Sequence, residues 1–389
     1  MKPMNSKHFS KLLLIVASVA LFSGCASPSA TTPSSGTSPT ASPAMGTDAK
    51  NLKDVRVQLA FLMQSIDAPL IVAINKGYFA EQGLNVTFER GFGNSDTISK
   101  LGTGKFDLAF SDMYNALNFN EKNPGDKIIA VAITQNGAPF SIISLKEKGI
   151  NSPKDLTGKK LGAPAGDGPR KLFPLFAKEV GIDPASVEWI TMEPKLRETF
   201  LMQGQVDAIS GFSTSALPAL LKGGKKMEDI NVFYYNENGL DFYGNAILVK
   251  EAFAKQNPDV VKAFTAAYIK GLQDVLKDPT AGLDAVLAAD QSKLMNREAE
   301  KVRMQIALER LFITPEAEKL GLGSVDPKRL EKSVEQTVVG FKLKGKPTAA
   351  DIYTAIYPVF CRFFTGQAAV GFAGGKSICD RDFPLSLPG

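Results

Sequence analysis

The sequence predicts an α/β protein built from two similar lobes. After residue 52, segments with strand-like alternation are followed by helical segments along most of the chain. Two short motifs, Asp67-Ala-Pro69 and Gly104-Lys-Phe-Asp107, return one hundred residues later as Asp167-Gly-Pro169 and Gly204-Gln-Val-Asp207. Roughly 335 residues follow the N-terminal region, which is enough for two domains of ordinary size.

The first predicted lobe opens with a strand and a well-marked helix. Asp67 suits an N-cap, and Pro69 is tolerated in the first turn, where no amide donor is needed. Gly77 ends this helix after Lys76. The other predicted elements are the strands 55–62, 85–89 and 106–110 and a short helix through Leu101 that Asn94, Ser95 or Asp96 can cap.

The second predicted lobe repeats this order of elements. Its strands are predicted at 159–164, 187–191 and 204–210, with a helix from 167 to 181 and another opened by Pro194. Trp189 lies in the middle of a strand and is expected in the core. Arg197 lies on a helix and is expected to be an exposed ion-pair partner.

The pattern becomes helical after a strand at 243–249. Residues 257–276 form an amphipathic helix, with Val261, Phe264, Tyr268 and Leu272 near one face. Further helices are predicted at 279–290, 298–312, 326–340 and 348–364, and all are expected to pack on the first lobe. The glycine-rich residues 366–389 are predicted to be a poorly structured C-terminal tail.

The N-terminus predicts export. Lysines at positions 2, 7 and 11 precede an apolar stretch, 12–22, which has the length of a signal-peptide core and is too short to span a bilayer. Its end, Leu21-Phe-Ser-Gly-Cys25, resembles a bacterial lipobox, although Phe22 stands where leucine is usual. We therefore expect a lipoprotein signal peptide at 1–24 and lipidation of Cys25, with plain secretion as the alternative.

A flexible tether is predicted at 25–51, where Ser, Thr, Pro, Ala and Gly dominate and few large apolar side chains occur. The folded part is then expected in the cell envelope. It would be periplasmic and anchored to a membrane by lipid, or secreted to the periplasm if Cys25 is not modified.

Charge and histidine content exclude several classes of function. The chain has a formal net charge of +5, and three positive charges belong to the signal peptide, so the exported part is near 5 − 3 = +2. This balance gives no basic face for nucleic acid. The single histidine, His8, lies in the signal peptide, so the exported chain cannot use histidine as a catalyst or as a metal ligand.

Two cysteines, Cys361 and Cys379, remain after Cys25. In an oxidising compartment they can pair, which would stabilise the fold by up to ~3 kcal/mol, or they can remain free thiols. Two thiols without imidazole do not suit zinc. We expect no metal, no cofactor and a monomer.

The candidate binding residues lie where strands end, because parallel α/β sheets bind ligands beyond the carboxyl ends of their strands. In the loop after residue 89, Gly93 allows close approach, and the amides and side chains of Asn94, Ser95 and Asp96 can hold an anionic or carbonyl oxygen. The alternative is that these polar residues only cap the following helix. The loop lacks the Gly-Lys-Ser/Thr ending of a nucleotide-binding loop.

The remaining candidates follow the same logic and come from both lobes. They are Gln64, Asp67, Ser111, Asp112, Asn136, Asp167, Gly168, Arg170, Ser213, Tyr243 and Asn245. Arg170 could pair with a carboxylate or sulfonate or could lie on the surface. Tyr243 could stack on a ring.

Four segments together resemble solute-binding proteins of ABC importers, in the branch for nitrate, sulfonates, taurine and thiamine-pyrimidine precursors. These segments are 76–86, 104–107, 155–162 and 204–207, and the resemblance covers roughly residues 54–358. It implies a two-lobed, type II periplasmic binding protein-like clamp with a helical C-terminal region. Lobe one would be 52–138 plus 246–365, and lobe two would be 139–245.

The resemblance also implies the function. Such a protein captures a small solute between its lobes, closes by hinge rotation and delivers the solute to an ABC permease. Eukaryotic pyrimidine synthases of the same superfamily use a histidine and a cysteine-rich motif, and the exported chain has neither. We therefore predict a binding protein, not an enzyme.

Two other functions stay open at this point: a periplasmic enzyme on the same fold that acts on a pyrimidine, and a ligand-sensing subunit for a signalling partner. The expected ligand is first a pyrimidine or other small heterocycle, then an aromatic or sulfonated acid, then an inorganic anion. Aromatic residues beside the candidate loops, Phe92, Phe212 and Tyr243, favour this order.

Overall fold

Two five-stranded sheets carry the fold of the computed structural model, which describes residues 52–354. The first sheet has the order β2-β1-β3-β10-β4, with β1 at Lys53–Gln58, β2 at Leu84–Glu89, β3 at Leu108–Asp112, β4 at Ile128–Ile133 and β10 at Asn245–Lys250. The second has the order β7-β6-β8-β5-β9, with β5 at Phe140–Leu145, β6 at Lys160–Ala163, β7 at Glu188–Thr191, β8 at Ala208–Phe212 and β9 at Ile230–Tyr234. We call the first sheet with its helices the first lobe and the second sheet with its helices the second lobe.

The two sheets have the same topology. In each, three parallel strands are followed in the sheet by an antiparallel strand, β10 in the first and β5 in the second, and this strand is the one at which the chain arrives from the other lobe. The predicted α/β class and the repeated order of elements are therefore confirmed. The repeat arises because each lobe uses one strand–helix–strand–helix–strand unit of parallel strands.

Helices connect the parallel strands. In the first lobe these are α1 at Ala68–Asn75, α2 at Tyr78–Glu81, α3 at Asn94–Gly102 and α4 at Met113–Lys122. In the second lobe they are α5 at Gly168–Glu179, α6 at Arg197–Met202 and α7 at Ser213–Lys222. Gly77 follows α1 with φ of 74°, the left-handed conformation that glycine adopts at little cost, so the chain turns there as predicted.

The chain crosses between the lobes twice. The first crossing segment, 134–139, joins β4 to β5, and the second, 235–244, joins β9 to β10. Both lobes belong to one compact unit. The exact lobe boundaries expected from the sequence stay predictions.

The C-terminal helices follow β10. They are α8 at Glu251–Gln256, α9 at Pro258–Lys277, α10 at Pro279–Ala289, α11 at Arg297–Ile306, α12 at Pro315–Leu320 and α13 at Pro327–Phe341, with a π-helical turn at Ala307–Phe312. The long helix α9 packs on α1 and buries Val261, Phe264 and Leu272, as its amphipathic pattern predicts.

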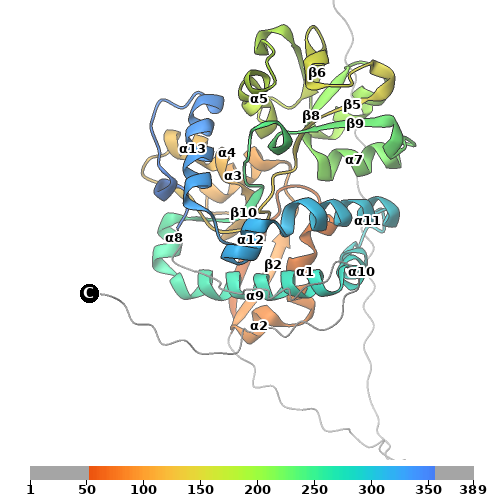
Figure 1. The fold of residues 1–389 in the computed structure, drawn as a ribbon. Coiled ribbons are helices and arrows are strands. Elements are labelled where there is room, and N and C mark those ends of the chain that lie inside the picture. The colour runs from red at the N-terminus through yellow and green to blue at the C-terminus, as the bar shows by residue number, and fades with distance from the viewer. Residues whose placement is uncertain (1–51, 355–389) are drawn as a thin grey trace, which may run out of the picture. The chain divides into compact units, whose positions relative to one another are not determined.

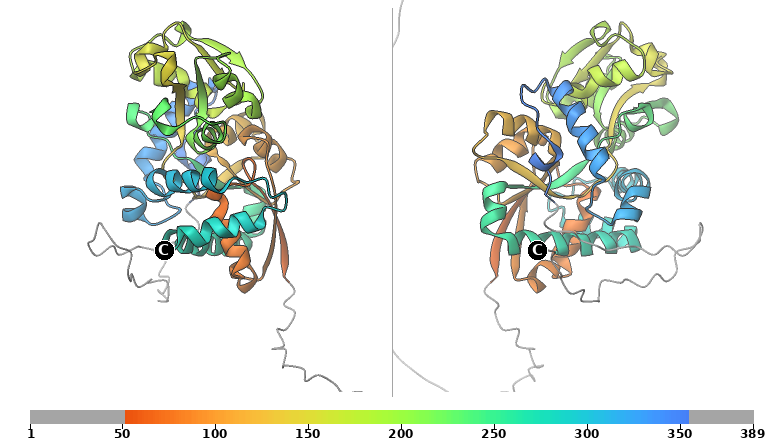
Figure 2. Two further views of the ribbon diagram at one scale, coloured as in Figure 1. Left: turned by 90° about the vertical axis from the view of Figure 1, so that its right-hand side faces the viewer. Right: turned by 60° about the vertical axis from the view of Figure 1, so that its left-hand side comes forward.

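Two of these helices contact the second lobe, and the expectation that all would pack on the first lobe is wrong. Helix α11 lies against α7, where the Arg303 Nε donates to the Thr214 carbonyl at 2.5 Å. Helix α13 packs on α5, where a Cβ at Gly340 would lie 2.8 Å from the Leu172 side chain. Figure 1 shows α11 between α7 and α10, and the turned views of Figure 2 show α13 beside both lobes.

The helix predicted at 348–364 is wrong over its described part. Only a 3-10 turn at Ala349–Asp351 forms, and the chain then extends beside β4. Ala130 accepts from the Thr354 amide at 3.0 Å and donates to Ile352 at 2.7 Å, so pairing with β4 replaces the helical bonds.

Several other predictions lie outside the described residues. These are the signal peptide 1–24, the tether 25–51, Cys25, Cys361, Cys379 and the tail 366–389. Among the described helices, none has the length and apolar character needed to cross a membrane.

Candidate functional site

A cleft of about 520 Å³ lies between the carboxyl ends of the parallel strands of both lobes. The first lobe lines it with the loops after β1 and β2 and with Asn245. The second lobe lines it with the loops after β6, β7 and β8. This is the place where ligands bind in open α/β sheets, and its volume suits a small organic molecule.

Nine of the predicted site residues line this cleft. They are Gln64, Asp67, Gly93, Asn94, Ser95, Asp96, Asp167, Gly168 and Asn245. They come from both lobes, so the structure brings together positions up to 181 residues apart in the sequence.

Asp67 enters the cleft from the first lobe, between the 3-10 turn Ser65–Asp67 and α1. Its Oδ2 accepts a hydrogen bond from the backbone N–H of Gln64 at 2.9 Å. Its Oδ1 has no hydrogen-bond partner among residues 52–354. Burial raises the pKa of the Asp67 carboxyl to about 7, although the Gln64 amide and the charge of Arg303 act in the opposite direction. The carboxylate thus has one oxygen free for a ligand.

Asp167 enters from the second lobe, at the equivalent place before α5. As the N-cap of α5 it accepts the Arg170 amide at Oδ2 at 3.1 Å, and the Ser210 hydroxyl donates to the same oxygen at 3.1 Å. Burial raises its pKa to about 6, with the Arg197 charge opposing the shift. Within the described part of the chain, Oδ1 has no hydrogen-bond partner, and neither aspartate forms an ion pair.

The loop before α3 presents backbone donors to the cleft. The N-cap is Gly93, with φ of 114°, and no side chain caps the helix, so the prediction of an Asn94, Ser95 or Asp96 cap is wrong. The amides of these three residues find no hydrogen-bond acceptor among the described residues. Three donors at a helix N-terminus can hold a carbonyl or anionic oxygen.

Ser95 also touches the opposite lobe. Its hydroxyl donates to the Gly166 carbonyl at 3.1 Å and lies 3.2 Å from the Asn115 Oδ1. A Cβ at Gly166 would lie 2.7 Å from the Ser95 Oγ, so a larger residue there would force the Ser95 side chain to move. This hydrogen bond therefore joins the two lobes at the cleft.

Six predicted residues lie outside the lining, and two of them support it. Asp112 caps α4 through the Asn115 amide at 2.8 Å and accepts a short hydrogen bond from the Asn94 side chain. Ser111 is buried beside it, with its hydroxyl 3.5 Å from the Asn94 carbonyl. Both residues therefore hold the N-terminus of α3 in place.

The other four point elsewhere. The Arg170 guanidinium donates to the Ala163 carbonyl at 2.8 Å and lies 4.8 Å from the ring centroid of Trp189. Ser213 is buried at the start of α7. Asn136 and Tyr243 lie in the two crossing segments, and the Tyr243 ring is covered by Arg329 at 3.9 Å. A buried and covered ring cannot stack on a ligand in the cleft.

Sequence reasoning missed two arginines that line the cleft. Arg197 was expected at the surface, but it is only 6% exposed, so that prediction is wrong. Its Nη2 pairs with Glu198 at 2.8 Å, and its Nη1 donates to the Ser210 carbonyl at 3.2 Å. The guanidinium occupies the space that a Cβ at Gly211 would fill, so Gly211 was the one signal in the sequence.

The second missed arginine, Arg303, comes from α11. It pairs with Glu300, which accepts the Ser65 amide at 2.7 Å, and it donates to Thr214 of the second lobe. These bonds form a polar path from the first lobe to the second along the cleft. No local pattern predicts it, because Ser65 and Glu300 are 235 residues apart.

Aromatic side chains complete the cleft. Phe61 and Phe92 line it from the first lobe and Phe212 from the second. Phe92 is 56% exposed, with the Arg90 guanidinium 4.2 Å and the Lys100 ammonium 4.7 Å from its ring centroid. Among residues 52–354, no group of three or more His, Cys, Asp or Glu side chains could hold a metal ion.

Comparison with known proteins assigns the chain to a family. A family model described as NMT1/THI5 like matches residues 65–282, more than half of the chain. The chain belongs to the NMT1/THI5-like family.

The relatives of this chain include proteins named for binding and proteins named as synthases. The riboflavin-binding protein RibY of Chloroflexus aurantiacus is 26% identical over 71% of this chain and 77% of its own length. The formylaminopyrimidine-binding protein of Halalkalibacterium halodurans is 26% identical over 68% and 79%. A 4-amino-5-hydroxymethyl-2-methylpyrimidine phosphate synthase of Schizosaccharomyces pombe is 25% identical over 54% and 62%.

Solved structures show the fold of this NMT1/THI5-like protein. The alkanesulfonate-binding protein SsuA from Xanthomonas axonopodis pv. citri, bound to MOPS, matches with a TM-score of 0.61 at 13% identity. The match covers 79% of this chain and 99% of that chain. The chain therefore has the type II periplasmic binding protein fold, as the sequence predicted.

Proposed function

We propose that this protein captures a small nitrogen heterocycle without net negative charge outside the cytoplasm and delivers it to an ABC permease. The observation that carries the proposal is the pair Asp67 and Asp167. Each carboxylate faces the cleft from a different lobe, and each keeps one oxygen free among the described residues. Free acceptors on both sides suit a ligand that carries N–H donors on two edges.

The other groups of the cleft support the same class of ligand. The phenylalanine rings offer faces for an aromatic ring. The unpaired amides of Asn94, Ser95 and Asp96 offer donors to a ring carbonyl or ring nitrogen. The relatives that bind riboflavin and formylaminopyrimidine carry names that fit this chemistry.

Charge disfavours sulfonates and inorganic anions. Both cleft arginines are already paired, Arg197 with Glu198 and Arg303 with Glu300. In their ionised form the two carboxyl groups would repel an anion in a site of low dielectric constant. A ligand that donates to neither aspartate would leave two half-buried acceptors without a partner.

Binding would proceed by closure without chemistry. The cargo would first contact one lobe, and rotation about the crossing segments would then bring the second carboxylate and the Ser95–Gly166 contact into place. The differential affinity of the cargo for the closed form sets the shift in population. The lipid anchor at Cys25 and the permease belong to this proposal and rest on the N-terminal sequence and the family.

Thermal unfolding of the purified protein against a panel of ligands tests the proposal. Pyrimidines, thiamine precursors, flavins, sulfonates, aromatic acids and nitrate are added at graded concentrations. A ligand at one hundred times its Kd stabilises the folded state by about 2.7 kcal/mol. We expect a dose-dependent rise in Tm with a nitrogen heterocycle. A rise with sulfonate or nitrate alone would contradict the ligand class.

Substitution of the two aspartates tests the roles of individual residues. Asp67→Asn and Asp167→Asn each replace a carboxyl group by an amide, which removes one acceptor oxygen, and we expect the Kd for the heterocycle to rise roughly 10- to 100-fold. Asp278→Asn is the matched control, because Asp278 also caps a helix, through the Ala281 amide at 2.9 Å, away from the cleft. An equal change in all three variants would refute the assigned roles.

Catalysis on the same fold is the second candidate, because pyrimidine phosphate synthases match the chain. Mass spectrometry of a heterocycle recovered after incubation with the protein separates the two functions. We expect the compound to be recovered unchanged, whereas a stoichiometric product would favour an enzyme.

A further inference from the structure

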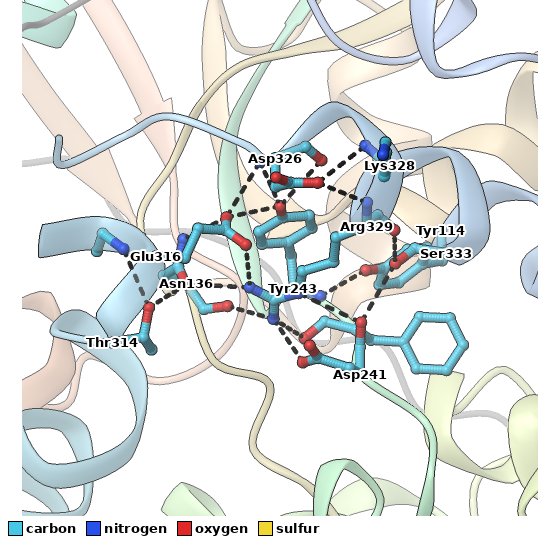
Figure 3. Close-up of polar contacts among 12 residues, drawn as sticks. Tyr114, Asn136, Asp241, Tyr243, Thr314, Glu316, Asp326, Lys328, Arg329 and Ser333 are labelled. Atoms are coloured by element: carbon cyan, nitrogen blue, oxygen red, sulfur yellow. Dashed lines mark hydrogen bonds and ion pairs between the residues drawn. The ribbon is translucent and has the colours of Figure 1, made fainter. Parts of the chain in front are cut away.

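One arginine outside the cleft binds both crossing segments. The Nη2 of Arg329, on α13, donates to the Asn136 carbonyl of the first crossing segment and to the Phe242 carbonyl of the second, each at 2.8 Å. Its Nε lies 3.4 Å from the Asp241 carbonyl. Figure 3 shows the guanidinium between the two segments.

Acidic and polar side chains hold this guanidinium in place. The Arg329 Nη1 lies 3.1 Å from both Glu316 Oε2 and Asn136 Oδ1, and the Tyr243 ring covers its face at 3.9 Å. The Tyr243 hydroxyl donates to Glu316 Oε1 at 2.7 Å and accepts the Asp326 amide at 2.8 Å. The Arg329 side chain is 13% exposed, so these bonds are largely shielded from water.

Helix α13 is also tied to the second crossing segment and to the second lobe. Midway along the helix, Ser333 donates to the Arg329 carbonyl at 2.8 Å and lies 3.4 Å from the Asp241 carbonyl. Near its end, Gly340 lies against Leu172 of α5, and the Lys171 ammonium lies 4.5 Å from the Phe341 ring centroid. The helix therefore fixes the guanidinium relative to α5, whose N-cap is the cleft residue Asp167.

We propose that Arg329 is a positioning residue that sets the angle between the two lobes, and thereby the affinity for cargo, from outside the cleft. Rotation of the lobes requires changes of backbone dihedral angles in the crossing segments. The Asn136 and Phe242 carbonyls can both meet one planar guanidinium only over a narrow range of those angles. Arg329 thus favours the arrangement in which Ser95 meets Gly166.

Lysine and glutamine substitutions test this role. Arg329→Lys keeps the charge but replaces the planar fork by a single ammonium, and Arg329→Gln removes the charge. Glu316→Gln is a milder third variant. It leaves Arg329 in place and weakens the ion pair that orients its guanidinium. Asp241→Asn is the matched control, because it removes an ion pair of 2.9 Å with a 61% exposed carboxylate and leaves every backbone carbonyl.

Lobe separation is measured without cargo by small-angle X-ray scattering, with hydrogen exchange of residues 160–170 as the second readout. The chain ends are identical in all variants, so differences in radius of gyration report the lobes. We expect a larger radius and faster exchange in Arg329→Lys, Arg329→Gln and Glu316→Gln, and no change in Asp241→Asn. Folded variants with unchanged radius and exchange would overturn the proposal.

The affinity part rests on the proposed binding function and is tested separately. With a heterocycle that binds the parent protein, we expect the Kd of Arg329→Lys to rise roughly tenfold, because fewer molecules are in the competent arrangement. An unchanged Kd would overturn the affinity part. Failure of every heterocycle to bind the parent protein would overturn the cargo assignment alone, since the scattering experiment uses no cargo.

Discussion

Asp67 and Asp167 show how one residue type at an equivalent position can give both lobes the same chemistry. Their Asp-x-Pro motifs indicated two helix starts, and the structure places both side chains in one cleft. The arginines near them could not be predicted, because a charged residue on a short helix is usually exposed. Arg197 is buried only because Gly211 leaves room for its guanidinium.

The raised pKa of Asp67 predicts a pH dependence of stability. Since burial raises its pKa from 3.8 to about 7, the folded state binds a proton that the unfolded state releases. Stability from this group is full below pH 4 and is lost as the pH rises through 7. We expect Asp67→Asn to reduce the loss of unfolding free energy between pH 5 and pH 8 by roughly 2 kcal/mol.

Urea unfolding of the parent and of Asp67→Asn at both pH values measures this difference. Asp54→Asn is the control, because Asp54 is an exposed residue of β1, away from the cleft. An equal pH dependence in the parent and in Asp67→Asn would contradict the assignment of the raised pKa.

At the scale of elements, local patterns predicted where most helices lie but not what those helices contact. The ranges 257–276 and 279–290 agree closely with α9 and α10, because caps and amphipathic spacing are local features. The contacts of α11 and α13 with the second lobe depend on residues far away in the chain. Glu300 and Arg303 are buried in α11 as an ion pair, although charged residues in a helical sequence usually indicate a solvent-exposed face.

The loop between β6 and α5 gives a prediction at this scale. Gly166→Ala adds a Cβ 2.7 Å from the Ser95 Oγ, so the Ser95 side chain must move and its bond to the Gly166 carbonyl is weakened. We expect cargo affinity to fall roughly tenfold, equivalent to about 1.4 kcal/mol, while the unliganded protein keeps its Tm. Isothermal titration calorimetry and thermal unfolding measure the two quantities.

Gly125→Ala is the matched control, because nothing lies within 4 Å of its added Cβ. If Gly166→Ala bound cargo as tightly as Gly125→Ala, the Ser95–Gly166 contact would not be part of the closed form.

At the scale of the whole molecule, the two sheets would suggest two independent domains. The sequence supported that picture, because each lobe repeats one set of motifs. The structure adds links that the motifs do not contain: Arg303 to Thr214, Arg310 to Glu237 at 2.7 Å, and α13 against α5. Each link joins a C-terminal helix or turn to the second lobe or to the second crossing segment.

These links predict that the two lobes unfold together. Differential scanning calorimetry of the unliganded protein should show one transition whose calorimetric and van't Hoff enthalpies agree. Arg303→Lys should keep the fold but loosen one link, and we expect its transition to broaden. Two resolved transitions in the parent protein would show that the lobes are energetically independent.

The Ser95–Gly166 bond has a consequence for selection by size. The bond joins the two lobes at a cleft of about 520 Å³, so the lobes can meet there only around a molecule that fits the cleft. A heterocycle with a bulky substituent could form a hydrogen bond with Asp67 and still keep the two lobes apart. Such a compound would occupy the receptor without producing the form that a transporter accepts, and it would act as an uptake inhibitor rather than as a nutrient.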